Sequence, residues 1–181
     1  MKTYPPLNRN RILSTSRHQL RLLTLVLMTV TVLAFVPQPT RAGTQVPFNA
    51  GFSGEFTTEF APPSSLHVLV TGLGNATHLG ATSAVSTDEL VNLEDNSGTA
   101  TFTLTGANGD RVVVWLTFEL TVVPGGFTSA AEYTVIGGTG RFDGVTGSGL
   151  GAASGMFTGP TTGVGSFTLS GTISSPGHLT K

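Results

Sequence analysis

The sequence of 181 residues contains no cysteine. Disulfide bonds and cysteine nucleophiles are therefore excluded, and the fold has to be stabilised by its core and its backbone hydrogen bonds. A Gly-x-Ser-x-Gly elbow is also missing, and no serine lies in a recognisable setting with histidine and aspartate. These absences remove the common hydrolase mechanisms from consideration.

Basic residues are scarce after residue 42. Six of the nine lysines and arginines precede residue 43, whereas all ten acidic residues follow it. Residues 43–181 thus carry three basic against ten acidic side chains, a formal charge of −7. Such a chain is repelled by nucleic acid phosphates and by anionic lipid headgroups, so we exclude both as partners.

The basic N-terminal segment has the pattern of a secretory signal. Residues 22–36 are apolar apart from threonines, prolines follow, and Thr40-Arg41-Ala42 offers small residues where a signal peptidase cleaves. We expect residues 1–42 to be removed and residues 43–181 to form one secreted domain, extracellular or periplasmic. An uncleaved membrane anchor is the alternative, but spanning a bilayer requires about 20 apolar residues and this run is shorter.

Residues 43–181 show no sustained helical period, and apolar residues alternate with polar ones instead. The alternation predicts eight strands, over residues 48–60, 66–71, 77–86, 99–105, 112–123, 127–136, 146–157 and 164–174. Eight antiparallel strands with short connections predict an all-β, eight-stranded antiparallel β-barrel, because closure removes the exposed edges. A β-sandwich is the alternative that periodicity leaves open.

The loop between the fourth and fifth predicted strands sets their register. A two-residue turn would mix threonines with apolar residues on one face, whereas a three-residue loop with a left-handed Gly109 pairs Phe102 with Val114. We predict the second register because it makes one face wholly apolar. Val113 and Trp115 then point outward, and this exposed apolar patch predicts a homo-oligomer that packs through the outer wall.

A glycine-rich motif gives the chain a family resemblance. The segment 133–147 includes Gly-Gly-Thr-Gly-Arg-Phe-Asp-Gly, which resembles a signature of the allene oxide cyclase and dirigent families. With segments 74–80 and 107–110, the chain also resembles a broad group of uncharacterised secreted bacterial proteins. The resemblance implies an eight-stranded antiparallel barrel, often trimeric in the plant families. It carries over no catalytic residue, because no motif here matches theirs.

Metal and cofactor sites are not indicated. The motif predicts a tight turn rather than a phosphate loop, because further glycines follow where a helix would be needed. The turn glycines are Gly137, Gly138, Gly140 and Gly144. His67 and His78 would be an incomplete metal site even if they faced each other, and the acidic connection 88–98 lacks the spacing of a calcium loop. We therefore predict no metal and no cofactor.

The predicted inward faces are aromatic and aliphatic, and they include Phe60 and Val85. Four glutamates fall on outward faces, namely Glu55, Glu59, Glu119 and Glu132, and the other acids lie in or beside turns. Tyr133 is then the only inward ionisable group, which argues against acid–base catalysis. The candidate pocket residues are Phe52, Phe56, Phe102, Leu116, Phe118, Tyr133 and Phe167.

Three functions are compatible with such a barrel. The leading hypothesis is a secreted, non-catalytic module that binds a small apolar molecule. The second is an isomerase or cyclase of the allene oxide cyclase type, which holds a reactive apolar substrate in a fixed shape. The third is a structural surface protein without a ligand. A cavity would favour the first two hypotheses, and a filled interior the third.

Overall fold

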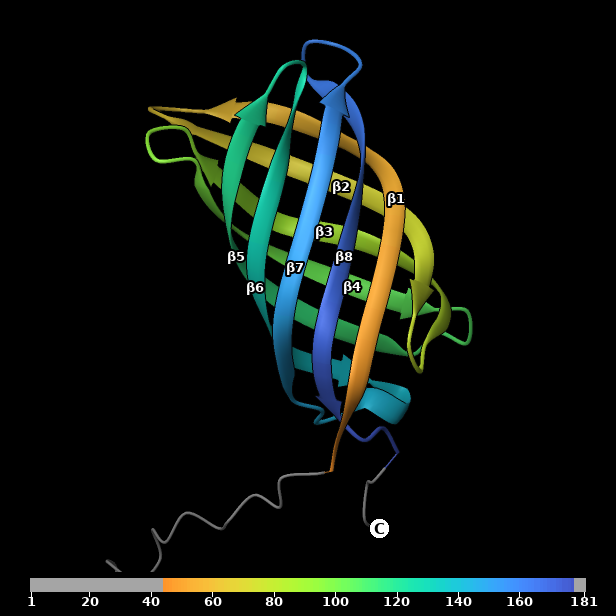
Figure 1. Cartoon of the computed structure of the whole chain (residues 1–181). Coiled ribbons are helices and arrows are strands. Elements are labelled where there is room, and N and C mark those ends of the chain that lie inside the picture. Colours follow the sequence, from red (N-terminus) through yellow and green to blue (C-terminus); the bar gives the residue numbers. More distant parts are fainter. Residues whose placement is uncertain (1–43, 178–181) are drawn as a thin grey trace, which may run out of the picture. The chain divides into compact units, whose positions relative to one another are not determined.

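The computed structural model describes residues 44–177, and their fold is an eight-stranded antiparallel barrel (Figure 1). Its strands are β1 (Gln45–Ala61), β2 (Ser65–Ala76), β3 (Gly80–Asn92), β4 (Ser97–Gly106), β5 (Arg111–Val123), β6 (Gly126–Thr139), β7 (Gly147–Phe157) and β8 (Thr162–Ser174). A short 3₁₀ helix, η1 (Gly140–Phe142), joins β6 to β7. Between residues 44 and 177, no helix has the length and apolar character needed to cross a membrane. The predicted signal segment, residues 1–42, lies outside the described residues.

The sheet closes because β1 pairs with both β2 and β8. The ladder between β1 and β8 runs from Gln45 opposite Ser174 to Thr57 opposite Thr162. Every other strand pairs with its neighbours in the chain, so no strand of the described barrel has a free edge. Closure removes the unpaired backbone groups that make sheet edges prone to aggregation. The predicted barrel is confirmed, and the sandwich is excluded.

We call the end of the barrel that carries η1, at the bottom in Figure 1, the closed end. Phe48, Phe142 and Ile173 are fully buried there. Phe142 belongs to the glycine-rich motif, which folds into η1 and directs this ring into the barrel. Gly140 and Gly144 have φ values of 65° and 69°. Their left-handed backbone, which glycine adopts at little cost, turns the chain around the ring as predicted.

The two preceding glycines of the motif belong to β6 and do not form the turn. Gly137 and Gly138 are not left-handed, so the prediction is wrong for them. A Cβ at Gly138 would lie 2.7 Å from the backbone oxygen of Arg111, closer than real Cβ atoms approach. Gly137 follows a register shift in which β6 has an extra residue between the partners of Val113 and Val114. Close approach of Phe142 in η1 and of Arg111 in β5, rather than a left-handed turn, therefore explains Gly138.

Loops at the closed end are joined by polar contacts. The Nε atom of Arg141 lies 2.8 Å from Oδ2 of Asp110, and its Nη2 donates to the carbonyl oxygen of His78 at 3.1 Å. The hydrogen bond from Arg141 holds the pKa of the Asp110 carboxyl below its usual value. The backbone N–H of Ser175 donates to the carbonyl of Thr44 at 2.8 Å. Three turns and both ends of the described chain thus meet here.

The β4–β5 hairpin has the predicted register. Phe102 lies opposite Val114, and Leu104 lies opposite Val112. Gly109 is left-handed, with a φ of 85°, and the Gly106 N–H donates to the Asp110 carbonyl across a three-residue loop. The all-apolar face is buried, in agreement with the rule that hydrophobic pattern sets register.

The β2–β3 hairpin differs from the prediction. Its strands are longer than predicted, and its turn lies at residues 77–79 instead of in the predicted connection between residues 71 and 77. Gly74 sits inside β2, where a Cβ would collide with the backbone of β1. This glycine therefore marks close strand packing instead of a turn. His67 pairs with Leu90 whereas His78 lies in the turn, so the two histidines are at opposite ends of the hairpin.

We expect the closed end to depend on Phe142. Replacing it by alanine should lower the free energy of unfolding by about 3–5 kcal/mol, because a fully buried ring would leave a cavity. Phe60 is the matched control: it is 57% exposed, contrary to its predicted inward position, and Phe60→Ala should cost less than ~1 kcal/mol. Urea denaturation followed by circular dichroism measures both values. Equal losses would show that η1 does not anchor the barrel.

Candidate ligand pocket

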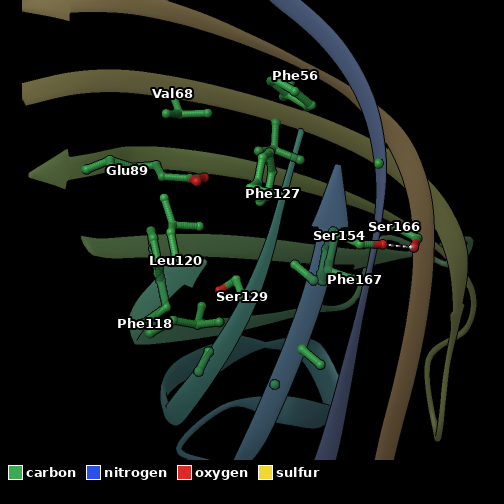
Figure 2. Close-up of a pocket in the computed structure, with 18 of the residues that line it drawn as sticks. Phe56, Val68, Glu89, Phe118, Leu120, Phe127, Ser129, Ser154, Ser166 and Phe167 are labelled. Carbon is green, nitrogen blue, oxygen red and sulfur yellow. Dashed lines mark hydrogen bonds between the residues drawn. The ribbon is translucent and has the colours of Figure 1, made fainter. Parts of the chain in front are cut away.

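The end opposite η1 is hollow, and we call it the open end. A cavity of about 250 Å³ opens there, close to the lower limit of the roughly 300–1,000 Å³ usual for small-molecule sites. Its wall is formed by all eight strands, and Figure 2 shows the side chains that surround it. Aliphatic and aromatic side chains dominate the lining, including Val68, Val70, Val91, Leu116, Leu120, Phe127 and Leu169.

Five of the seven predicted pocket residues line this cavity: Phe56, Phe102, Leu116, Phe118 and Phe167. The predictions for Phe52 and Tyr133 are wrong, because both lie deeper in the core. The Phe52 ring stacks on Phe167 with centroids 4.7 Å apart. The Tyr133 ring meets Phe48 edge-on at 6.5 Å. The stacked rings close the floor of the cavity.

Three phenylalanines gather near the mouth. The Phe56 centroid lies 5.5 Å from that of Phe127 and 5.3 Å from that of Phe157, both in edge-to-face geometry. Phe127 and Phe157 were not among the predicted pocket residues. They lie at the start of β6 and the end of β7. At strand ends, the alternation of apolar and polar residues does not show which side chains line the mouth. This aromatic cluster gives an apolar entrance to the cavity.

An acidic side chain also points into the cavity, contrary to the prediction that only Tyr133 is ionisable and inward. Glu89 lies on β3 opposite Val68, and both residues line the pocket (Figure 2). The pairing of β3 with β4 shifts between Thr87 and Leu90. Ahead of the shift, Ser86 is buried and Val85 is 39% exposed, so the predicted inward position of Val85 is also wrong. The irregularity changes which residues face inward.

Glu89 has an unusual environment for a carboxyl group. Its Oε2 atom is buried and has no hydrogen-bond partner. Burial raises the pKa of Glu89 from 4.5 to about 7, and a hydrogen bond with the Ser86 side chain offsets part of the increase. The Ser86 hydroxyl oxygen also accepts the Val70 N–H at 2.7 Å. At neutral pH this carboxyl can therefore donate or accept a proton inside an apolar cavity.

Tyr133 is the other buried polar group without a partner in the described chain. Burial raises the pKa of its phenol above the usual value of 10.0. A Cβ on Gly171 would lie 2.7 Å from the phenol oxygen, so the glycine makes room for it. Because Tyr133 does not line the cavity, we assign it to the core.

The acidic connection has a local structural role. Its first part belongs to β3, and only residues 93–96 form the loop to β4. Asp95 accepts hydrogen bonds from the backbone and the hydroxyl of Ser97 at 2.9 and 2.7 Å, and Glu94 accepts one from Ser64 at 3.0 Å. Within residues 44–177, no three His, Cys, Asp or Glu side chains are grouped as metal ligands would be.

The predicted interface residues lie on the outer wall. Trp115 pairs with Thr101 and Thr134 and is 41% exposed, and Val113 pairs with Thr103. Their outward orientation agrees with the hairpin register. The homo-oligomer itself stays a prediction.

The pH dependence of stability should report the burial of Glu89. Its pKa is higher in the folded chain than in the unfolded one, so ionisation opposes folding. The contribution of the neutral Glu89 carboxyl to the free energy of unfolding is fully present below pH ~4.5 and is lost as pH rises through about 7. We expect Glu89→Gln to match wild type at low pH and to exceed it at pH 8 by on the order of 3 kcal/mol. Urea denaturation at both pH values measures this.

A matched control for that experiment is Asp88→Asn. Asp88 is exposed and has a φ of 56°, which asparagine tolerates. Its replacement should give no comparable gain at pH 8. If Glu89→Gln also gave none, the Glu89 carboxyl would be in contact with water.

A charge on the outer wall should test the predicted oligomer. We expect Trp115→Arg to remain folded, because the side chain points away from the core. If copies of the chain pack through this wall, the variant should be monomeric where wild type is not. Light scattering and circular dichroism measure mass and fold. Monomeric wild type at tens of micromolar would contradict the oligomer, and unfolding of the variant would contradict the outward orientation.

Comparison with known proteins gives a likeness of structure. No family model matches the sequence, and no curated protein matches it. Among solved structures, the chain is similar to a pterocarpan synthase dirigent protein, with 13% sequence identity and a TM-score of 0.47. The match covers 80% of this chain and 92% of that protein. The closed eight-stranded barrel itself rests on the strand pairing of this chain.

Proposed function

We propose that this chain is a secreted, non-catalytic barrel that binds a small apolar molecule at its open end. The observation that carries the proposal is the cavity of about 250 Å³ with its aromatic and aliphatic wall. An apolar ligand gains free energy by leaving water for such a wall, at about 25 cal/mol per Å² of buried apolar area.

The rest of the barrel supports a preformed site. Phe102 and Phe167 lie 4.8 Å apart at their centroids, and the β-ladders fix the strands that carry them. The closed end is filled, so the cavity opens in one direction only. A structural protein without a ligand has no need for this cavity. A filled interior would make the barrel more stable, because side chains that line a void lose packing contacts.

Secretion is part of the proposal and is supported by the sequence. A basic leader, an apolar run and a small-residue cleavage site precede residue 43. The cysteine-free domain that follows can fold without an oxidising environment, because its sheet is closed by hydrogen bonds alone. We propose the extracellular space or the periplasm as its location.

Glu89 favours a second candidate, the isomerase or cyclase. A carboxyl group with a pKa of about 7 is suited to transfer a proton to or from a bound molecule. The two candidates differ in what leaves the cavity. A carrier releases its ligand unchanged, whereas an isomerase releases a product of equal mass and different chromatographic retention.

Filling the cavity should weaken binding of a neutral apolar probe. N-phenyl-1-naphthylamine becomes more fluorescent when it leaves water. Ala131 lines the pocket and is half-buried, and Ala131→Leu should raise the Kd of this probe at least tenfold, about 1.4 kcal/mol. Fluorescence titration of the purified protein measures the change.

The control for this variant is the neighbouring residue. Ala130 is exposed on the outer face of the same strand, and Ala130→Leu should leave the Kd within twofold. Circular dichroism checks that both variants fold. Absence of probe binding to wild type, or equal Kd values in the two variants, would reject the cavity as the binding site.

A further inference from the structure

The positive charges of the barrel lie far from its cavity. Residues 44–177 contain two arginines and no lysine. Both arginines, Arg111 and Arg141, belong to the closed end. Arg141 is already bound to Asp110. Near the mouth, the described chain has one basic side chain, that of His67, which precedes the lining residue Val68.

Carboxylates, in contrast, surround the mouth. Glu59 and Glu119 each adjoin a residue that lines the cavity. Glu94 and Asp95 lie in the β3–β4 loop, between two further lining residues. All four side chains are exposed. Their combined field raises the local concentration of cations at the mouth and lowers that of anions.

Inside the cavity, Glu89 faces no opposite charge. Val68 adjoins it from β2, and Leu120 and Phe127 surround the cavity from β5 and β6 (Figure 2). Glu55 is the other residue of the lining with an ionisable side chain, and that side chain is exposed on the outer face. Oε2 of Glu89 therefore lacks both a hydrogen-bond donor and a counter-ion within the described chain.

We propose that the ligand is an apolar molecule with one basic nitrogen, whose ammonium group binds the Glu89 carboxylate inside the cavity. The inference rests on the proposed function and adds the chemical class of the ligand. An ammonium N–H would supply the missing donor to Oε2, and its charge would balance a carboxylate that is otherwise costly to bury. The hydrocarbon part of the ligand would pack against the aromatic rings at the bottom of the cavity.

Other ligand classes fit the site less well. An apolar acid would meet acidic side chains at the mouth and a second carboxyl group inside, and like charges repel strongly in a cavity of low polarity. An alcohol would supply a donor but no charge, so it would leave the carboxylate unbalanced. The ligand charge is therefore the property that the experiment has to vary.

Three naphthalene compounds of similar shape vary this charge. They are 1-naphthylmethylamine, 1-naphthalenemethanol and 1-naphthoic acid, which at pH 8 are a cation, a neutral molecule and an anion. Displacement of N-phenyl-1-naphthylamine from the purified protein gives a Kd for each. We expect the amine to bind at least tenfold more tightly than the alcohol, and the acid to bind most weakly.

Two variants assign the preference to one carboxyl group. In Glu89→Gln, we expect the amine and the alcohol to bind within threefold of each other, because the charge is gone. Asp88→Asn removes an exposed charge from the adjacent residue, and it should keep the preference for the amine. Between pH 6 and 8 the amine stays protonated. Its affinity for wild type should therefore rise as Glu89 ionises, and its affinity for Glu89→Gln should stay constant.

The outcomes separate this inference from the proposed function. If the alcohol binds wild type in a way that Ala131→Leu weakens, but the amine binds no more tightly, the cavity binds ligands and the amine proposal is wrong. A preference for the amine that persists in Glu89→Gln also overturns it. If the probe binds wild type but none of the three compounds displaces it, the amine proposal is wrong; if the probe itself does not bind, the proposed function fails as well.

Discussion

The pairing of β1 with β8 is the constraint on which the rest of the structure depends. Once the sheet is closed, alternate residues of every strand share one interior. Each polar residue that faces this interior then needs a hydrogen-bond partner there. At the closed end, Phe48 and Phe142 fill that interior completely. Towards the open end the same interior stays hollow, and the cavity results from this difference in filling.

Much of the barrel could be predicted because its strands alternate regularly. The phase of β1, β4, β5 and β8 places Phe56, Phe102, Leu116 and Phe167 inside, and one comparison of two turns was enough to set the β4–β5 register. The glycines of β2 do not show their role in the local sequence. Gly74 has the sequence context of a turn, but the collision that excludes a side chain there comes from β1, which is distant in sequence.

The acidic site escaped prediction for a related reason. The sequence predicted a strand that ended at residue 86, with Val85 marking its inward face, so Glu89 fell into the acidic connection 88–98. The residues that do face inward there are small or polar, such as Ala84 and the fully buried Ser86. After the register shift, Glu89 and Val91 share the inward face. Their spacing of two was visible in the sequence, but an acidic stretch has the composition of a loop.

The meeting of both ends of the described chain at the closed end has a practical consequence. The hydrogen bond between Ser175 and Thr44 joins the residue before β1 to the residue after β8, at the closed end (Figure 1). Any tether joined to the barrel through either end would therefore present the cavity outward. A fused reporter or an immobilising tag joined there leaves the mouth of the cavity accessible.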